Sequence, residues 1–152
     1  MNPTELTQEV QFGLDNLNKL HHRVTYISAL EIDKVVKISA LTYECFGYYN
    51  AIEHIILRFT KYLKIPTPGG AFSHKEVLKN FSQLVREREI PAEATTLNTI
   101  LELMAFRHVA TKIYAFLIDE KKLEVIVTKI TNEHSQIVLL FNQLLASVTH
   151  DS

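Results

Sequence analysis

Glycine and proline are scarce in this chain, and that scarcity limits what it can fold into. Only four residues of each type occur in 152. They are Pro3, Gly13, Gly47, Pro66, Pro68, Gly69, Gly70 and Pro91. No stretch of useful length between them alternates apolar and polar residues as a half-buried strand does. Long stretches with few breaks are typical of helical bundles.

Apolar residues recur at steps of three and four within these stretches, which places them along one side of a helix. We expect helices over about residues 3–24, 33–63, 74–87 and 91–118, and a last helix from 119 to about 148. The sequence therefore predicts an all-α protein, an up-and-down helical bundle of four to five helices. It would form a single domain over residues 1–152, ordered over about 3–148.

Residues that favour helix ends support these boundaries. Pro3 suits the first position of a helix, where no intrahelical bond needs its missing N–H. Ser73 followed by Glu76 has the spacing of a capping box, and Asp119 is a candidate N-cap for the last helix. The cluster of prolines and glycines at residues 66–70 ends the second helix and is expected to form the main loop.

Charge and cysteine content exclude several classes of protein. Sixteen basic against seventeen acidic side chains give a net charge of -1, so any contact with RNA has to be local. The single Cys45 allows no internal disulfide and no thiolate cluster, which fits a reducing cytoplasm. No apolar run is long enough for a membrane span, and the first twenty residues carry acids rather than a leader pattern. We expect a soluble cytoplasmic protein.

The seven histidines lack the spacing of a metal site. No HxxxH, HExxH or ExxH pair occurs, so neither a metal nor another cofactor is expected. His134 falls on the apolar side of the last helix and is interpreted as a packed core histidine, while His21 and His22 are given structural roles.

Two clusters of basic residues remain as candidate sites. The first, His54 with Arg58 and Lys61, follows steps of four and three and is either a solvated helix end or a phosphate contact. The second lies in the segment 106–114, where polar side chains interrupt an otherwise apolar helix. Such groups are costly to bury unless they meet a partner, a ligand or a second subunit.

The second cluster contains Arg107, His108, Lys112 and Tyr114. On a continuous helix Arg107 and Tyr114 share one stripe, and Lys112 lies about 140° round from Arg107. A purely structural alternative stays open, in which Arg107 pairs with Glu102 or with a carboxylate of a neighbouring helix. In that alternative Tyr114 packs at the rim of the bundle with its hydroxyl satisfied.

The order of these features resembles the HepT-like branch of the HEPN ribonuclease superfamily. The resemblance runs over about residues 3–148. It rests on a Tyr-Tyr-Asn-Ala-Ile-Glu centre at 48–53, the Pro-Gly loop, a helix beginning Ser-His-Lys-Glu at 73–76, and Phe-Arg-His-Val at 106–109 followed by Tyr114. The family signature is an Arg, four to six residues and a His, commonly followed by one residue and a Tyr.

The resemblance implies a small all-α homodimer that brings two copies of the motif to a shared cleft and cuts RNA without a metal. It also implies a toxin encoded beside an MNT-type minimal nucleotidyltransferase, the antitoxin, which can add AMP to the motif tyrosine. Here Arg107 matches the motif Arg and Tyr114 the motif Tyr, but Lys112 stands where the His belongs. Lysine normally stays charged, so it can hold a phosphate more readily than it can accept a proton.

Three hypotheses follow. In the first, the protein is an active toxin in which Arg107 and Lys112 hold the scissile phosphate and His108 or Tyr114 assists proton transfer. In the second, it is a catalytically inactive HEPN dimer that binds RNA or nucleotide, or that partners a nucleotidyltransferase. In the third, it is an unrelated bundle. Arg58 and Lys61 are additional candidates for phosphate contact, and Tyr114 is either the AMP acceptor or a rim tyrosine.

Overall fold

The computed structural model describes residues 1–66, 69, 73–112 and 118–150. Over these residues the chain is helical, with no strand. The helices are α1 (Pro3–Ala29), α2 (Lys34–Tyr62), α3 (Ser73–Glu87), α4 (Ala94–Ala110) and α5 (Glu120–His150). The predicted all-α class and the predicted helical bundle are confirmed.

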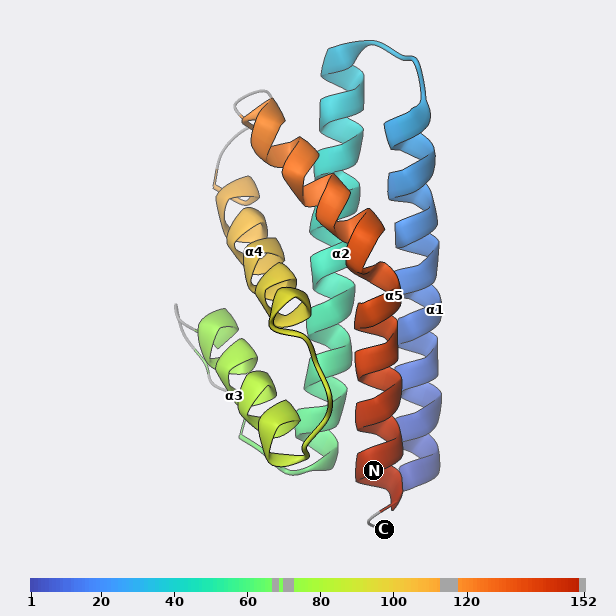
Figure 1. The fold of residues 1–152 in the computed structure, drawn as a ribbon, viewed down its shortest axis with the longest axis vertical. Coiled ribbons are helices and arrows are strands. Elements are labelled where there is room, and N and C mark those ends of the chain that lie inside the picture. The colour runs from blue at the N-terminus through green and yellow to red at the C-terminus, as the bar shows by residue number, and fades with distance from the viewer. Residues whose placement is uncertain (67–68, 70–72, 113–117, 151–152) are drawn as a thin grey trace.

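Three long helices, α1, α2 and α5, lie side by side, and the shorter α3 and α4 lie together along one side of α2 (Figure 1). Helix α2 contacts each of the other four helices. Its central position explains why it buries residues on several sides, including Tyr48, Tyr49, Ile52 and Phe59, which are fully buried. Side chains of α2 can therefore reach both α3 and α4.

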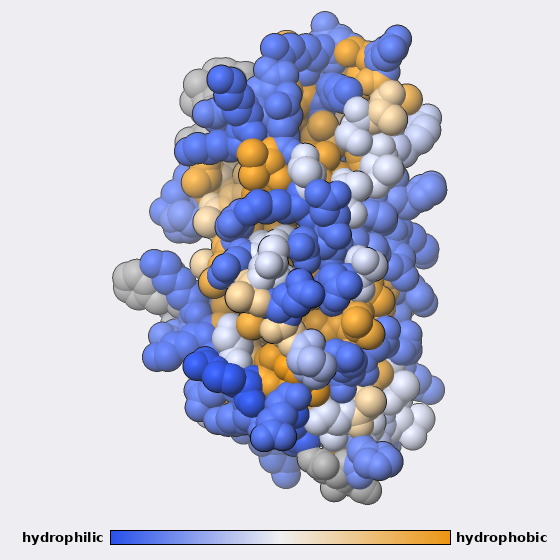
Figure 2. All heavy atoms as spheres, in the orientation of Figure 1, coloured by the Kyte–Doolittle hydropathy of each residue, from blue (hydrophilic) through white to orange (hydrophobic). Residues whose placement is uncertain are grey.

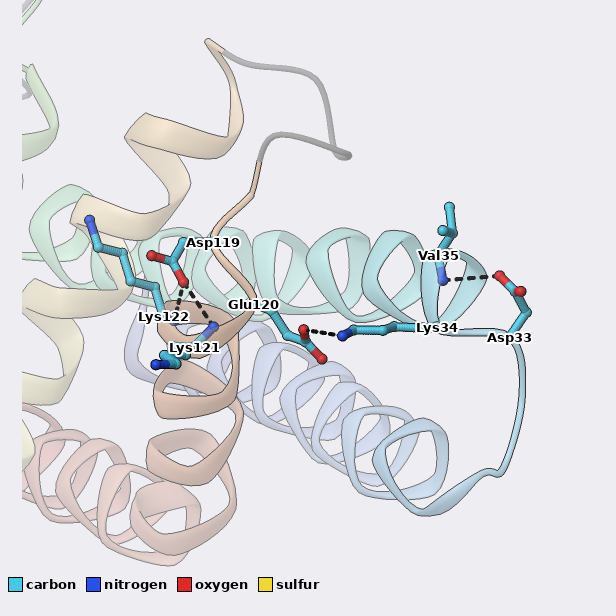
Figure 3. A network of polar contacts seen from close by, with 7 residues as sticks. All are labelled: Asp33, Lys34, Val35, Asp119, Glu120, Lys121 and Lys122. Atoms are coloured by element: carbon cyan, nitrogen blue, oxygen red, sulfur yellow. Dashed lines mark hydrogen bonds and ion pairs between the residues drawn. The ribbon is translucent and has the colours of Figure 1, made fainter.

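Side-chain caps mark where the long helices begin. The Glu5 backbone N–H donates to Asn2 Oδ1 (2.9 Å) just before Pro3, the first residue of α1. The backbone N–H groups of residues 121 and 122 donate to Asp119 Oδ1 at 2.9 and 3.4 Å (Figure 3). Each bond satisfies a backbone donor that the first helical turn leaves without a partner. The predictions for Pro3 and Asp119 are confirmed.

Helices α2 and α5 begin close together. Asp33 caps α2 by accepting from the Val35 N–H (3.0 Å), and Lys34 forms an ion pair with Glu120 at the start of α5 (2.7 Å; Figure 3). The Lys34 side chain is largely in water and that of Glu120 is partly so, and such exposed ion pairs contribute little to stability. The effect of this ion pair is to tie the starts of α2 and α5 together.

Helices α2 and α3 are each followed by a residue whose backbone lies in the left-handed region. Lys64 has φ 58° and Glu89 has φ 54°, a region that favours glycine. The Ile65 N–H donates to the Thr60 carbonyl at 2.8 Å, and the Ile90 N–H donates in the same way to the Val85 carbonyl at 3.1 Å. This bond pattern closes a helix end and turns the chain away from the axis.

The core contains the His134 side chain, as predicted from the sequence. His134 is 9% exposed, which confirms the prediction of a core histidine. Its Nε2–H donates to Asn18 Oδ1 (2.7 Å), its Nδ1 accepts from the Tyr48 hydroxyl (2.9 Å), and its ring stacks on that of His21 with centres 4.0 Å apart. These partners suit a neutral imidazole. Burial, and next the neighbouring His21, lower the pKa of His134 to about 4.

Helix α4 is shorter than predicted. We expected a helix over 91–118, but α4 begins at Ala94 and ends at Ala110. At its end the Thr111 hydroxyl donates to the His108 carbonyl (2.9 Å), and the Lys112 N–H donates to the Val109 carbonyl (3.0 Å), a tighter turn than an α-helix makes. The β-branched residues at 111 and 113 also favour helix less than unbranched ones. Lys112 therefore lies beyond the helix that carries Arg107.

Polar residues cover most of the face seen in Figure 2, and hydrophobic ones show between them as separate groups. This pattern fits helices that turn their apolar sides toward the core. Within the described parts of the chain, no helix combines the length and the apolar character needed to cross a membrane.

Candidate active site around Arg107

Arg107 lies in the last turn of α4 and its side chain reaches α2. Its Nε donates to Asn50 Oδ1 at 2.7 Å, and the guanidinium carbon lies 5.1 Å from the centre of the Phe46 ring. Phe46 and Asn50 are one helical turn apart and so share a face of α2. A hydrogen bond and an aromatic face together hold the guanidinium in a fixed place.

His74, in the first turn of α3, lies between that guanidinium and a carboxylate. Its Nδ1 is 2.7 Å from Glu53 Oε2, and its Nε2 is 3.2 Å from Arg107 Nη1. Arginine only donates, so Nε2 has to be the accepting nitrogen and Nδ1 carries the proton that goes to Glu53. The partners on the two sides thus assign a neutral ring with its proton on Nδ1.

These contacts form one chain of polar groups across three helices. It runs from Asn50 to Arg107, His74 and Glu53, with both ends on α2 and the middle on α4 and α3. The Glu53 side chain is 17% exposed and that of His74 is 36% exposed. The chain of contacts is therefore partly shielded from water but open at His74. Beside it, burial and then the negative charge of Glu53 raise the pKa of Tyr49.

Arg107 and His74 line a pocket of about 330 Å³ between α3 and α4. Its other polar lining residues are Lys75 and His108, and Met104, Ala105 and Val109 supply the apolar part. No acidic side chain is among its described lining residues. A guanidinium, an ammonium group and two imidazoles around one opening suit an anion, and imidazoles can also transfer a proton near neutral pH.

The structure brings together only some of the residues predicted for this site. Arg107 and His108 both line the pocket. Lys112 is exposed in the turn after α4 and is not among the described lining residues. Helix α4 ends at Ala110, and the stripe that we expected Arg107 to share with Tyr114 stays a prediction. Tyr114 itself lies outside the described residues.

The predicted basic stripe on α2 lies at another place. Arg58 contacts Glu9 of α1 (3.3 Å) and lies 3.4 Å from His54 Nε2. His54 and Arg58 both line a pocket between α1 and α2 that is separate from the pocket at Arg107. Lys61 is exposed in the last turn of α2. These residues stay candidates for phosphate contact, but not at the Arg107 pocket.

The purely structural alternative, in which Arg107 pairs with Glu102, is wrong in that partner. Glu102 forms its ion pair with Lys129 of α5, not with Arg107. The guanidinium is held instead by an amide, an aromatic ring and an imidazole, none of which carries a negative charge in the state described. Among the described residues no carboxylate pairs directly with its charge, although Glu53 lies one residue further along the polar chain.

Sequence reasoning missed His74 and Glu53 as site residues. The two are 21 positions apart on different helices, and His74 and Arg107 are 33 apart, so their pairing depends on how the helices pack. A signal was present in the segment 48–53, where Asn50 and Glu53 are polar residues three positions apart in a buried stretch of helix. Two polar groups on one side of a buried helix indicate a partner on a neighbouring element.

The chain is similar to a known protein family. A family model described as "HepT-like protein" matches residues 40–148, well over half of the chain. The matched range contains Asn50, Glu53, His74 and Arg107, which are all four members of the polar chain. A search of curated proteins and a search of solved structures found no match.

Proposed function

This chain belongs to the HepT-like family of HEPN proteins, and from that premise we propose that it is a ribonuclease toxin that cuts RNA without a metal ion at the Arg107 pocket. One observation carries the proposal. The guanidinium of Arg107 is held in place beside two imidazoles, on a pocket with no acidic side chain among its described lining residues. A site of that composition attracts a phosphate and can move protons around it.

Arg107 is suited to hold the scissile phosphate. Within the described part of the chain, two of its five N–H donors are used, by Asn50 and His74. The remaining donors can bind two phosphate oxygens at once, which a lysine cannot do with the same geometry. Arg107 would then stabilise the extra negative charge of the five-coordinate phosphorus that forms during cleavage. Lys75 and the exposed Lys112 can contact neighbouring phosphates of the strand.

The proposed reaction is an internal transesterification. The ribose 2′ oxygen loses its proton and attacks phosphorus, the bond from phosphorus to the 5′ oxygen breaks, and that oxygen takes up a proton. The products are a 2′,3′-cyclic phosphate and a 5′-hydroxyl end. Since His108 lines the pocket with Arg107, it is placed to protonate the leaving oxygen.

A homodimer is the proposed assembly, in line with a family whose members are usually dimeric. Val109, which lines the Arg107 pocket, is exposed, as are two other large apolar side chains, Leu101 two turns before it on α4 and Val125 on α5. Val109 and Val125 also line a neighbouring, mostly apolar pocket of about 410 Å³ between α4 and α5. Joining two copies through this face would cover the apolar residues and bring the two Arg107 pockets together.

The family resemblance also suggests the partner and its chemistry. We propose an MNT-type minimal nucleotidyltransferase as antitoxin, with Tyr114 as acceptor of AMP. Incubation with its cognate nucleotidyltransferase and ATP should add the mass of one AMP at Tyr114. Tyr114→Phe should stay unmodified, and an unmodified wild-type protein would contradict the scheme.

One observation favours a second candidate function. Lys112 occupies the position of the motif histidine and is exposed in a turn rather than lining the pocket. A protein that has lost its motif base but kept Arg107 could bind RNA or nucleotide without cutting it. In that case the chain would serve as the binding partner of the nucleotidyltransferase.

Cleavage of RNA in EDTA tests the proposal and separates the two candidates. Purified protein should cut tRNA or total RNA and leave 2′,3′-cyclic phosphate ends, and Arg107→Ala should abolish the activity. Arg86→Ala is a matched control, because Arg86 is an exposed arginine in the last turn of α3. RNA binding without any cleavage would favour the inactive relative. Both candidates would be contradicted by the absence of cleavage together with the absence of binding to RNA, to nucleotide and to the nucleotidyltransferase.

A further inference from the structure

The motif leaves the proton of the 2′-hydroxyl without an acceptor. Lys112, in the place of the motif histidine, is exposed and lies outside the described lining of the pocket. Because Lys112 lies outside that lining, it is not placed to take the proton. We propose that His74, oriented by Glu53, is the general base of this site and replaces the missing motif histidine from a different helix. The inference rests on the ribonuclease function proposed above.

The geometry of His74 suits a base rather than an acid. Its Nδ1–H donates to Glu53 Oε2 at 2.7 Å, which leaves the lone pair on Nε2 as the only site that can accept a proton. The Glu53 carboxylate both fixes the orientation of the ring and stabilises the imidazolium that forms when Nε2 takes the proton. In hydrolase triads an acidic residue and a histidine have the same two roles: the acid orients the ring and stabilises its charge, and the histidine takes the proton.

The basic nitrogen also lies where the substrate would be. Nε2 is 3.2 Å from Arg107 Nη1, so a phosphate held by Arg107 brings its ribose close to His74. In the structure that lone pair accepts an N–H of Arg107. A phosphate bound by the free donors of Arg107 would also compete for this N–H, which releases the lone pair, so that the base becomes available together with the substrate.

Proton and electron transfers balance with the residues of the pocket. Nε2 of His74 takes the proton of the 2′-hydroxyl, and the oxygen lone pair forms the new bond to phosphorus. The electrons of the broken bond stay on the 5′ oxygen, which takes a proton from protonated His108. The two imidazoles end with exchanged protonation states, and solvent restores them.

His108 is the weaker candidate for the base. It lines the same pocket but is exposed, and among the described residues no carboxylate contacts its ring. A histidine without such a partner is free to reorient and is not biased toward one tautomer. His74 differs in being held on both nitrogens.

The test compares single-turnover cleavage in EDTA of a 5′-labelled, mixed-sequence single-stranded RNA of about 30 nucleotides. His74→Ala and His74→Gln should both lose about 10²- to 10⁴-fold in rate, the usual contribution of a general base. Glu53→Gln should lose less, since it removes the charge but keeps a hydrogen-bonding amide. His22→Ala is the matched control, a histidine exposed on α1, and should cut like the wild type.

Added imidazole distinguishes a base from a structural residue. It should restore part of the activity of His74→Ala, because free imidazole can enter the space and accept the proton, but it should not restore Arg107→Ala. Melting temperatures of all variants are measured alongside. Inactivity of His74→Ala without rescue, with His74→Gln still active, would overturn the assignment.

The two proposals fail in different ways. If the wild type cuts RNA and both His74 variants cut within about threefold of its rate, His74 is not the base and the ribonuclease function stands. If the folded wild type cuts no RNA while it still binds RNA, the ribonuclease function is wrong and the assignment of His74 is wrong with it.

Discussion

Lowering the pH from 7.5 to 5 is predicted to destabilise the fold through His134. This ring is buried and neutral, with its two nitrogens engaged by Asn18 and Tyr48. Burial and the neighbouring His21 lower its pKa from 6.5 to about 4. In the unfolded chain the ring regains its ordinary pKa, so below pH 6.5 the unfolded state binds a proton that the folded state does not.

The sign and size follow from that difference. A lowered folded-state pKa means that the stabilisation is complete above pH 6.5 and is lost as the pH falls toward 4. One pKa unit corresponds to about 1.4 kcal/mol, so the loss is about 2 kcal/mol at pH 5 and about 3 kcal/mol at pH 4. A domain of this size has about 5–15 kcal/mol in all, which makes the change large enough to measure.

Urea unfolding followed by circular dichroism at pH 7.5, 6.5, 5.5 and 5.0 measures this loss. The range stays above the pH at which most carboxylates titrate. His134→Gln cannot titrate and should lose about 2 kcal/mol less than the wild type between pH 7.5 and 5. The exposed His22 provides the control, since His22→Gln should keep nearly the wild-type slope. Equal losses in wild type and His134→Gln would refute the reasoning.

Three further substitutions test other features. Lys64→Gly should stabilise by about 0.5–1 kcal/mol in urea unfolding, because Lys64 has φ 58°; an unchanged midpoint would speak against strain there. Gly13→Ala should destabilise by about 1–3 kcal/mol, because its Cβ would lie 2.6 Å from Ile55 Cγ1; a protein as stable as wild type would show that the contact relaxes. In sedimentation at micromolar concentration, Val125→Glu should dissociate the proposed dimer. Val36→Glu introduces the same charge at a similarly exposed valine in the first turn of α2 and should not; equal behaviour would exclude this face.

The fold was predictable from sequence because its signals are local. Apolar steps of three and four, Pro3 at the start of α1, the cap at Asp119 and the Pro-Gly loop each act within a few residues. They placed the helices to within a turn or so at most ends. The end of α4 was the exception. The apolar pattern continues past Ala110, but the tighter turn at Thr111 ends the helix. The spacing of apolar residues does not show where such a turn replaces helical hydrogen bonds.

For the site too, the sequence supplied the local features, and the contacts between distant residues came from the structure. From the sequence, the family resemblance puts Arg107 forward as the motif arginine and Lys112 in the place of the motif histidine. Only the tertiary structure decided that His74 lies against Arg107 and Glu53, because residues 21 and 33 positions apart meet only when α3 and α4 pack on the same face of α2. Spacing along one helix carries no information about contacts between helices, which are set by how side chains of all of them fill the core.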